Sequence, residues 1–406
     1  MKKLWYSPTL RSVFVYGVSG LGFAGANLML ARLLPTTEYA LFTLVLALAN
    51  LGYSLAPAGV DGIVNRRLLD AGPRLLRRTL FASLPVGVIF VLVARIAYHM
   101  SPLMLVVLFV STVAGGAMAV AGAHFQSERR FGISLALTQS PNLVLLVAAL
   151  AVVVSKDRKA WLPLIISALG FLLAAVYGWL VLFRERKSRP PRDAWFPWSE
   201  ALSFAGLNAA GLVLIQLDRL IIPYVRPLQE LATYGVLAAI AGSLFRVLQM
   251  GVGYTLVPRL RAVGSVPERR HLIAHEARLV GAMLVAGTVA IWLVTPWIEH
   301  WLLEDKYHLA GSLLAAALVS GVAKIIDAFA KSTVSALATP AELSLVNLVG
   351  WACVALAIVA SLFGGRWGLE GVIYGVAIGW LARALAAFYI TARHVRLPAA
   401  VAATAP

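Results

Sequence analysis

The chain has 406 residues, of which 60% are hydrophobic and only 13% are charged. A soluble domain has about 25% charged residues, so this composition leaves too few polar side chains to cover a water-facing surface. It excludes most soluble enzyme architectures and predicts a membrane protein that crosses the bilayer many times. The single cysteine, Cys353, excludes an intramolecular disulfide and a cysteine-based metal site.

Twelve apolar runs have the length of about 17 to 25 residues that a membrane-spanning helix needs. They lie at 12–31, 39–60, 79–98, 102–123, 134–155, 162–183, 200–225, 232–257, 277–297, 310–334, 343–362 and 371–392. The first run is too long for a secretory signal, and Ala31-Arg32-Leu33 is no small-residue cleavage site. The pattern predicts an all-α polytopic membrane protein with about twelve transmembrane helices.

The basic residues beside these runs predict the orientation. With a cytoplasmic N-terminus, 22 flanking Lys and Arg fall on the inner side and seven on the outer side. The positive-inside rule therefore predicts that both termini are cytoplasmic. Basic stripes beside anionic headgroups also account for most of the net charge of +17, so no nucleic-acid partner is expected.

A charged connection with two prolines, residues 184–199, separates six runs from the other six. The chain is therefore divided into an N-terminal six-helix lobe at 1–183, a cytoplasmic linker at 184–199, a C-terminal six-helix lobe at 200–392 and a cytoplasmic tail at 393–406.

The two halves also share a sequence repeat. A shift of 192 positions superposes Pro35 on Pro227, Glu38 on Glu230, Ala40 on Ala232, Phe42 on Tyr234, Ala47 on Ala239, Ala49 on Ala241, Gly59 on Gly251, Val60 on Val252 and Arg67 on Arg259. An even number of six spans in each half gives both lobes the same orientation. Parallel repeats of this kind form transporters that work by alternating access around a site between lobes.

Three motifs resemble those of a known family: residues 32–42 (RLLPTTEYALF), 59–67 (GVDGIVNRR) and 218–223 (DRLIIP). They are similar to the polysaccharide and O-antigen flippases of the multidrug/oligosaccharidyl-lipid/polysaccharide (MOP) exporter superfamily. Many relatives have glycine where this chain has Ala40, and the chain ends soon after the twelfth span, which favours twelve spans over fourteen.

The resemblance implies two bundles that form a V around a central cationic cavity. The protein would flip a polyprenyl-pyrophosphate-linked glycan from the cytoplasmic to the outer leaflet of a bacterial inner membrane. The expected partners are an undecaprenyl-pyrophosphate-linked glycan, membrane lipids, and a polysaccharide polymerase with its chain-length machinery.

Six basic residues lie within the predicted spans: Arg95, Arg219, Arg246, Lys324, Lys331 and Arg383. Each costs about 2.5 to 3.5 kcal/mol at the centre of a membrane helix, so it should face a bundle interior or a wet cavity. Arg246, Lys324 and Arg383 lie near the middle of their spans and, together with Arg219, are the predicted substrate-binding residues. Arg95 and Lys331 lie near span ends, where a long side chain can reach the interface.

Three aspartates are the candidates for coupling or gating: Asp327, Asp218 and Asp61. Asp327 lies three residues after Lys324, on the same helical face. It either neutralises that lysine or belongs to an anion-binding surface on which it titrates during transport. Asp218 is adjacent to Arg219, so the two cannot face each other, and each needs another partner. Asp218 and Arg219 therefore either form a structural latch between spans or contact the substrate.

Asp61 lies beside Arg66 and Arg67, which favours an interfacial ion pair. The histidines have no paired ligand spacing, so we expect no metal and no cofactor, only coupling to H+ or Na+.

Three classes of function compete. The midplane cations favour a flippase for a lipid-linked oligosaccharide. The alternative is an ion-coupled small-molecule exporter, since residues 70–78 are faintly similar to the major facilitator loop motif, although Gly72 follows Asp70 too closely. A membrane glycosyltransferase or polymerase would need a large outer loop or an acidic metal site, and the loop at 298–309 is short. We therefore expect a transporter and not an enzyme.

Overall fold

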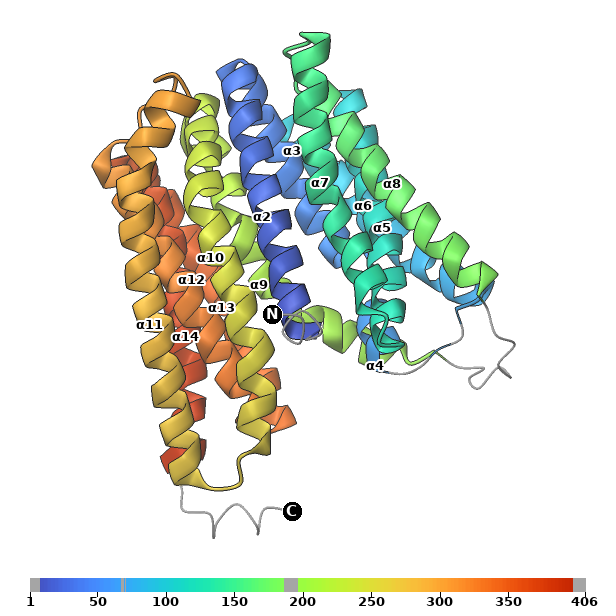
Figure 1. Cartoon of the computed structure of the whole chain (residues 1–406), viewed down its shortest axis with the longest axis vertical. Helices are drawn as coiled ribbons and strands as arrows, with labels where there is room; N and C mark the ends of the chain where they lie inside the picture. The colour runs from blue at the N-terminus through green and yellow to red at the C-terminus, as the bar shows by residue number, and fades with distance from the viewer. Residues whose placement is uncertain (1–7, 67–68, 70, 186–195, 397–406) are drawn as a thin grey trace. The chain divides into compact units, whose positions relative to one another are not determined.

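The computed structural model describes residues 8–66, 69, 71–185 and 196–396. Within these ranges it contains no strand and twelve helices of 20 residues or more, in the order of the twelve predicted runs (Figure 1). This confirms the all-α class and the number of long helices.

The chain forms two compact units, Met1–Leu220 and Ile221–Pro406. The first contains α2 (Pro8–Leu33), α3 (Thr36–Leu55), α4 (Val60–Arg66), α5 (Pro73–Tyr98), α6 (Pro102–Ser127), α7 (Phe131–Ser155), α8 (Trp161–Arg184) and most of α9 (Trp198–Val225). The second contains α10 (Leu228–Ala262), α11 (Val266–Trp297), η1 (Ile298–Leu302), α12 (Gly311–Leu337), α13 (Pro340–Gly364), η2 (Gly365–Trp367) and α14 (Leu369–Arg396).

The division between the units falls inside α9, whereas the sequence predicted a linker at 184–199. The reason is that the start of α9 packs into the first unit, where Ala201 is fully buried in its core. Linker residues 186–195 and tail residues 397–406 lie outside the described ranges. The V-shaped arrangement of lobes around a cavity stays a prediction.

Ten of the described helices are long and apolar enough to cross a membrane. Their exposed positions are largely leucine, valine and isoleucine, such as Val154 on α7 and Leu293 on α11. A helix suits this environment because it satisfies all of its backbone hydrogen bonds internally, as hydrocarbon requires. The chain is a multi-pass membrane protein.

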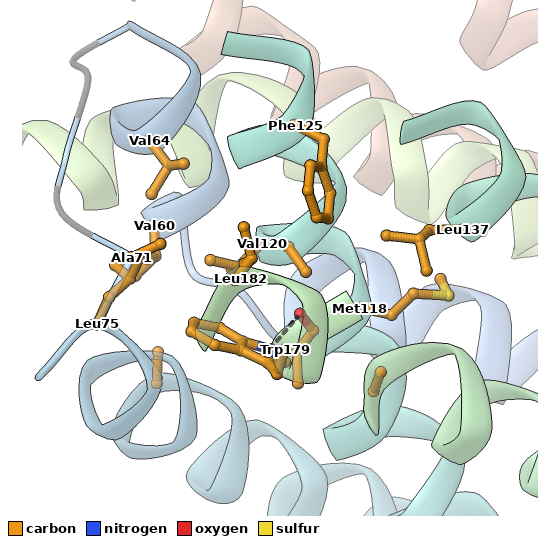
Figure 2. Close-up of a cluster of buried hydrophobic side chains, with 14 of the residues drawn as sticks. Val60, Val64, Ala71, Leu75, Met118, Val120, Phe125, Leu137, Trp179 and Leu182 are labelled. Atoms are coloured by element: carbon orange, nitrogen blue, oxygen red, sulfur yellow. Dashed lines mark hydrogen bonds between the residues drawn. The ribbon is translucent and has the colours of Figure 1, made fainter. Parts of the chain in front are cut away.

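The core of the first unit is a cluster of buried side chains contributed by α4 to α9 (Figure 2). Trp179 lies at its centre beside Val120 and Leu182. A buried indole N–H needs a partner. Trp179 Nε1 donates to the carbonyl oxygen of Ala117 on α6 at 3.0 Å, which is the dashed line in Figure 2.

The sequence repeat is also a structural repeat. Pro35 and Pro227 cap the N-termini of α3 and α10 with nearly the same φ, −53° and −54°. Ala40 and Ala232 are both fully buried one turn later. In the first unit α6 packs against α3 and α8, and in the second α12 packs against α10 and α14, so corresponding helices have corresponding neighbours.

The repeated glutamate has a similar task in each unit. Glu38 Oε2 accepts a hydrogen bond from the backbone N–H of Ala160, immediately before α8. Glu230 binds Arg226 at 2.7 Å, and Arg226 also points a guanidinium N–H at the carbonyl of Gly365, just before α14. The first contact ties the start of α3 to the residue before α8, and the second ties the segment before α10 to η2, just before α14.

Gly59 permits a close approach between the α3–α4 turn and α9. Its φ is +82°, and an added Cβ would lie 1.8 Å from the carbonyl oxygen of Ala201. We predict that Gly59→Ala lowers the free energy of unfolding by about 1 to 3 kcal/mol or more. Alanine is strained at a positive φ, and its Cβ would also clash with the Ala201 carbonyl. The measurement is thermal unfolding of purified protein in detergent.

Gly281→Ala on α11 is the matched control, since nothing lies within 4 Å of its added Cβ. It should leave the melting temperature unchanged or raise it, because alanine favours a helix over glycine. Equal melting temperatures for Gly59→Ala and the parent would contradict this description of the turn.

Candidate functional site

One face of α12 is polar although the helix lies in a membrane-spanning segment. Ser320, Lys324, Asp327 and Lys331 follow one another at intervals of four, three and four residues, which places them on one side of the helix. α14 packs along α12 and contributes Arg383. Along this face of α12 and the middle of α14, three basic side chains, Lys324, Lys331 and Arg383, accompany one carboxylate, Asp327.

Asp327 and Arg383 form an ion pair across the two helices. Arg383 Nε lies 3.6 Å from Asp327 Oδ1, and the side chains are only 7% and 3% exposed. From the sequence, Asp327 either neutralises Lys324 or belongs to an anion-binding surface, and the structure adds Arg383 of α14 as a further partner of Asp327. The pairing of α12 with α14 is a tertiary contact that helical spacing within one segment cannot predict.

The pair is not fully satisfied by hydrogen bonds. A separation of 3.6 Å is too long for one. In the part of the chain that the structure describes, Arg383 Nη1, Asp327 Oδ1, Trp380 Nε1 and Ser320 Oγ are buried without a hydrogen-bond partner. The Arg383 guanidinium also lies 5.8 Å from the Trp380 ring centroid. Buried polar atoms in this condition indicate bound water or a ligand, and the excess of cations favours an anion.

The other predicted residues lie elsewhere in the fold. Arg219 on α9 donates from Nη1 to Gln216 Oε1 at 2.8 Å, and its neighbour Asp218 is fully buried. Arg246 lies on α10, but its side chain is outside the described part of the structure. Arg95, in the last turn of α5, reaches the carbonyl oxygen of Met100, consistent with a position near a span end.

The sequence predicted interfacial ion pairing of Asp61 beside Arg66 and Arg67, and the structure describes only Arg66 of these two basic residues. Arg66 Nη1 instead donates to Glu200 Oε1 of α9 at 2.9 Å. Asp61 lies in the first turn of α4, where burial raises the pKa of its carboxyl and the backbone N–H of Gly62 opposes that effect. Arg67 is outside the described residues. The partner of Arg66 is 134 residues away, a tertiary contact that local spacing does not reveal. The ion pairing of Asp61 stays a prediction.

An uncharged polar cluster, which the pattern of charged residues does not reveal, lies between α2 and α7. Ser19 on α2 and Gln139 and Asn142 on α7 are hydrogen-bonded to one another. The available signal was the polar stretch Thr138-Gln139-Ser140-Pro141-Asn142 in the centre of the predicted span 134–155. Among the described residues, no group of three His, Cys, Asp or Glu side chains could hold a metal ion.

Comparison with solved structures identifies the fold. An inward-facing multidrug resistance MATE family transporter of the MOP superfamily matches with a TM-score of 0.61 and 13% identity, over 96% of each chain. The lipid II flippase MurJ, in an inward closed conformation, matches with a TM-score of 0.61 and 10% identity, over 93% of this chain and 86% of its own. The chain has the fold of the MOP superfamily.

A third MOP-fold structure, a MATE in complex with MaL6, matches with a TM-score of 0.59 and 12% identity, over 95% of this chain and 96% of that one. No protein-family model matches the sequence, and no curated protein matches it. The MOP fold includes both a multidrug transporter and a lipid flippase, so the substrate has to be argued from the residues.

A double-mutant cycle tests the Asp327–Arg383 pair. We predict that Asp327→Asn and Arg383→Gln each lower the stability by about 3 to 5 kcal/mol, because each leaves one buried charge without its partner. The double variant should lose clearly less than the sum, since it removes both charges. Denaturation of the purified protein by detergent titration measures all four stabilities, and strictly additive losses would show that the two side chains do not interact.

Proposed function

We propose that the protein is a flippase for a polyprenyl-pyrophosphate-linked oligosaccharide. It would move this lipid from the cytoplasmic to the outer leaflet of a bacterial inner membrane by alternating access, for the synthesis of a surface polysaccharide or O-antigen. The observation that supports this substrate class is the buried Arg383, held by one carboxylate among more cations than anions.

The chemistry of the headgroup matches that cluster. A guanidinium binds phosphate oxygens through paired, charge-assisted hydrogen bonds, and Arg383 Nη1 has no hydrogen-bond partner within the described residues. A pyrophosphate would offset the excess positive charge, while the polyprenyl chain stays in the surrounding lipid. A cationic cargo would be repelled by the same residues.

Asp327 suits a competitive role in this mechanism. Its carboxylate occupies the guanidinium before substrate arrives, and phosphate oxygens would replace it. A sodium ion at Asp327 would have to displace Arg383, so of the two coupling ions we favour a proton. Asp218 and Asp61 stay predictions as further gating residues, and Arg219, Arg246 and Lys324 as further headgroup contacts.

An ion-coupled small-molecule exporter is the second candidate. The similarity to MATE transporters, which equals the similarity to MurJ by TM-score, supports it. Transport assays separate the two, because a flippase moves a lipid between leaflets and an exporter moves a soluble molecule across the membrane.

The direct test is flipping in proteoliposomes that contain purified protein and fluorescent undecaprenyl-pyrophosphate-linked oligosaccharide. We predict movement by the parent and a loss of at least about ten-fold in Arg383→Gln, because one charge-assisted contact to phosphate is lost. Arg95→Gln is the matched control, an intramembrane arginine outside the cluster, and it should flip like the parent. Ethidium export without lipid flipping would favour the second candidate instead.

The proposed orientation has its own test. The 22 to 7 bias of flanking basic residues predicts that Lys306, between η1 and α12, is external. In a Cys353→Ala background, Lys306→Cys should react with a membrane-impermeant maleimide added to whole cells, and cysteines at Pro190 and Thr404 should not. Labelling of position 306 only after lysis would reverse the orientation.

A further inference from the structure

The middle of α7 contains several uncharged polar side chains, and only some of them have a role in the helix itself. Thr138, Gln139, Ser140 and Asn142 surround Pro141, halfway along a membrane-spanning helix of 25 residues. Each such group is costly in hydrocarbon unless it has a hydrogen-bond partner.

Two of the four side chains repair the helix. Pro141 has no N–H to donate to the carbonyl of Leu137, and Ser140 Oγ donates to that oxygen at 2.8 Å instead. Thr138 Oγ1 donates to the carbonyl of Ser134 at 2.9 Å. These two hydroxyls are therefore explained by the helix itself.

Gln139 and Asn142 form hydrogen bonds with each other and with α2 instead of with the backbone of α7. Ser19 Oγ of α2 donates to Gln139 Oε1 at 2.9 Å, and Asn142 Nδ2 donates to Ser19 Oγ at 2.8 Å and to Gln139 Oε1 at 3.1 Å. Ser19 is almost fully buried, so the cluster is fixed at the α2–α7 contact. The network fixes the orientation of both amides.

Each amide has one end left over. No contact in the described part of the chain uses Gln139 Nε2 or Asn142 Oδ1, and both side chains are half-buried rather than sealed. Among the described contacts, the structure thus leaves one N–H donor, Gln139 Nε2, and one carbonyl acceptor, Asn142 Oδ1, on two amides that the network holds in place.

We propose that Gln139 and Asn142, positioned by Ser19, bind hydroxyl groups of the sugar part of the transported lipid; this assignment rests on the proposed function. A sugar hydroxyl accepts from Gln139 Nε2, and the same or an adjacent hydroxyl donates to Asn142 Oδ1. The pair has no formal charge, so it contributes to recognition of the sugar and not of the pyrophosphate. A hard cation is a poor alternative, because it needs several oxygen ligands and the pair offers one unused oxygen.

The test compares two probes that differ only in the sugar: undecaprenyl pyrophosphate, and the same lipid with one N-acetylglucosamine on the pyrophosphate. Binding of each is measured to the purified full-length chain in one detergent. The parent should bind the sugar-bearing probe more tightly. Gln139→Ala and Asn142→Ala should weaken that probe about five- to ten-fold and leave the sugar-free probe unchanged.

Thr138→Val is the matched control, because its hydroxyl serves only the helix in the contacts that the structure describes, and it should bind both probes as the parent does. Unchanged binding of the sugar-free probe also shows that a variant is folded. The site assignment is overturned if the variants weaken both probes equally, if they weaken neither, or if the parent does not distinguish the probes. If the parent binds neither probe, the proposed function fails as well.

Discussion

A hydrocarbon interior supplies no hydrogen-bond partners, and every polar group that this chain places there has to find one within the protein or its cargo. This constraint explains the all-helical fold, in which the backbone satisfies itself. It also sorts the intramembrane polar residues. Those with helix or packing partners, such as Ser140 and Trp179, need no further explanation. Those with unused polar atoms are the candidates for function.

Among the described residues with unused polar atoms, two groups, one in each unit, carry the two proposals. In the second unit the Asp327–Arg383 pair is buried yet too long for a hydrogen bond, and Arg383 retains an unused N–H group. In the first unit the amides of Gln139 and Asn142 each have an end that no contact among the described residues uses. One site is charged and the other is neutral, which matches the two chemistries of a pyrophosphate-linked sugar. Stability alone does not require either arrangement, since an apolar pair of similar volume is often at least as stable as a buried ion pair.

The sequence predicted the positions of the long helices but not the interaction partners of the charged side chains. Apolar length predicted every long helix, because the bilayer imposes it, and the repeat predicted that Pro35 and Pro227 begin equivalent helices. The partner of Asp327 lies on another helix, and that of Arg66 lies 134 residues away, so periodicity within one segment could not find either. The amides of α7 were not predicted for a different reason. The candidate residues were chosen by charge, whereas uncharged amides also cost free energy in hydrocarbon unless they are hydrogen-bonded.

The central claim is that Asp327 and the anionic headgroup compete for the same guanidinium. The most direct measurement is the affinity of sugar-free undecaprenyl pyrophosphate for the parent and for Asp327→Asn, each expressed per folded molecule in the same detergent. If the carboxylate competes with phosphate, its removal leaves Arg383 available and the variant binds the lipid more tightly. Equal or weaker binding by the variant would show that Asp327 holds the fold together without controlling access to Arg383.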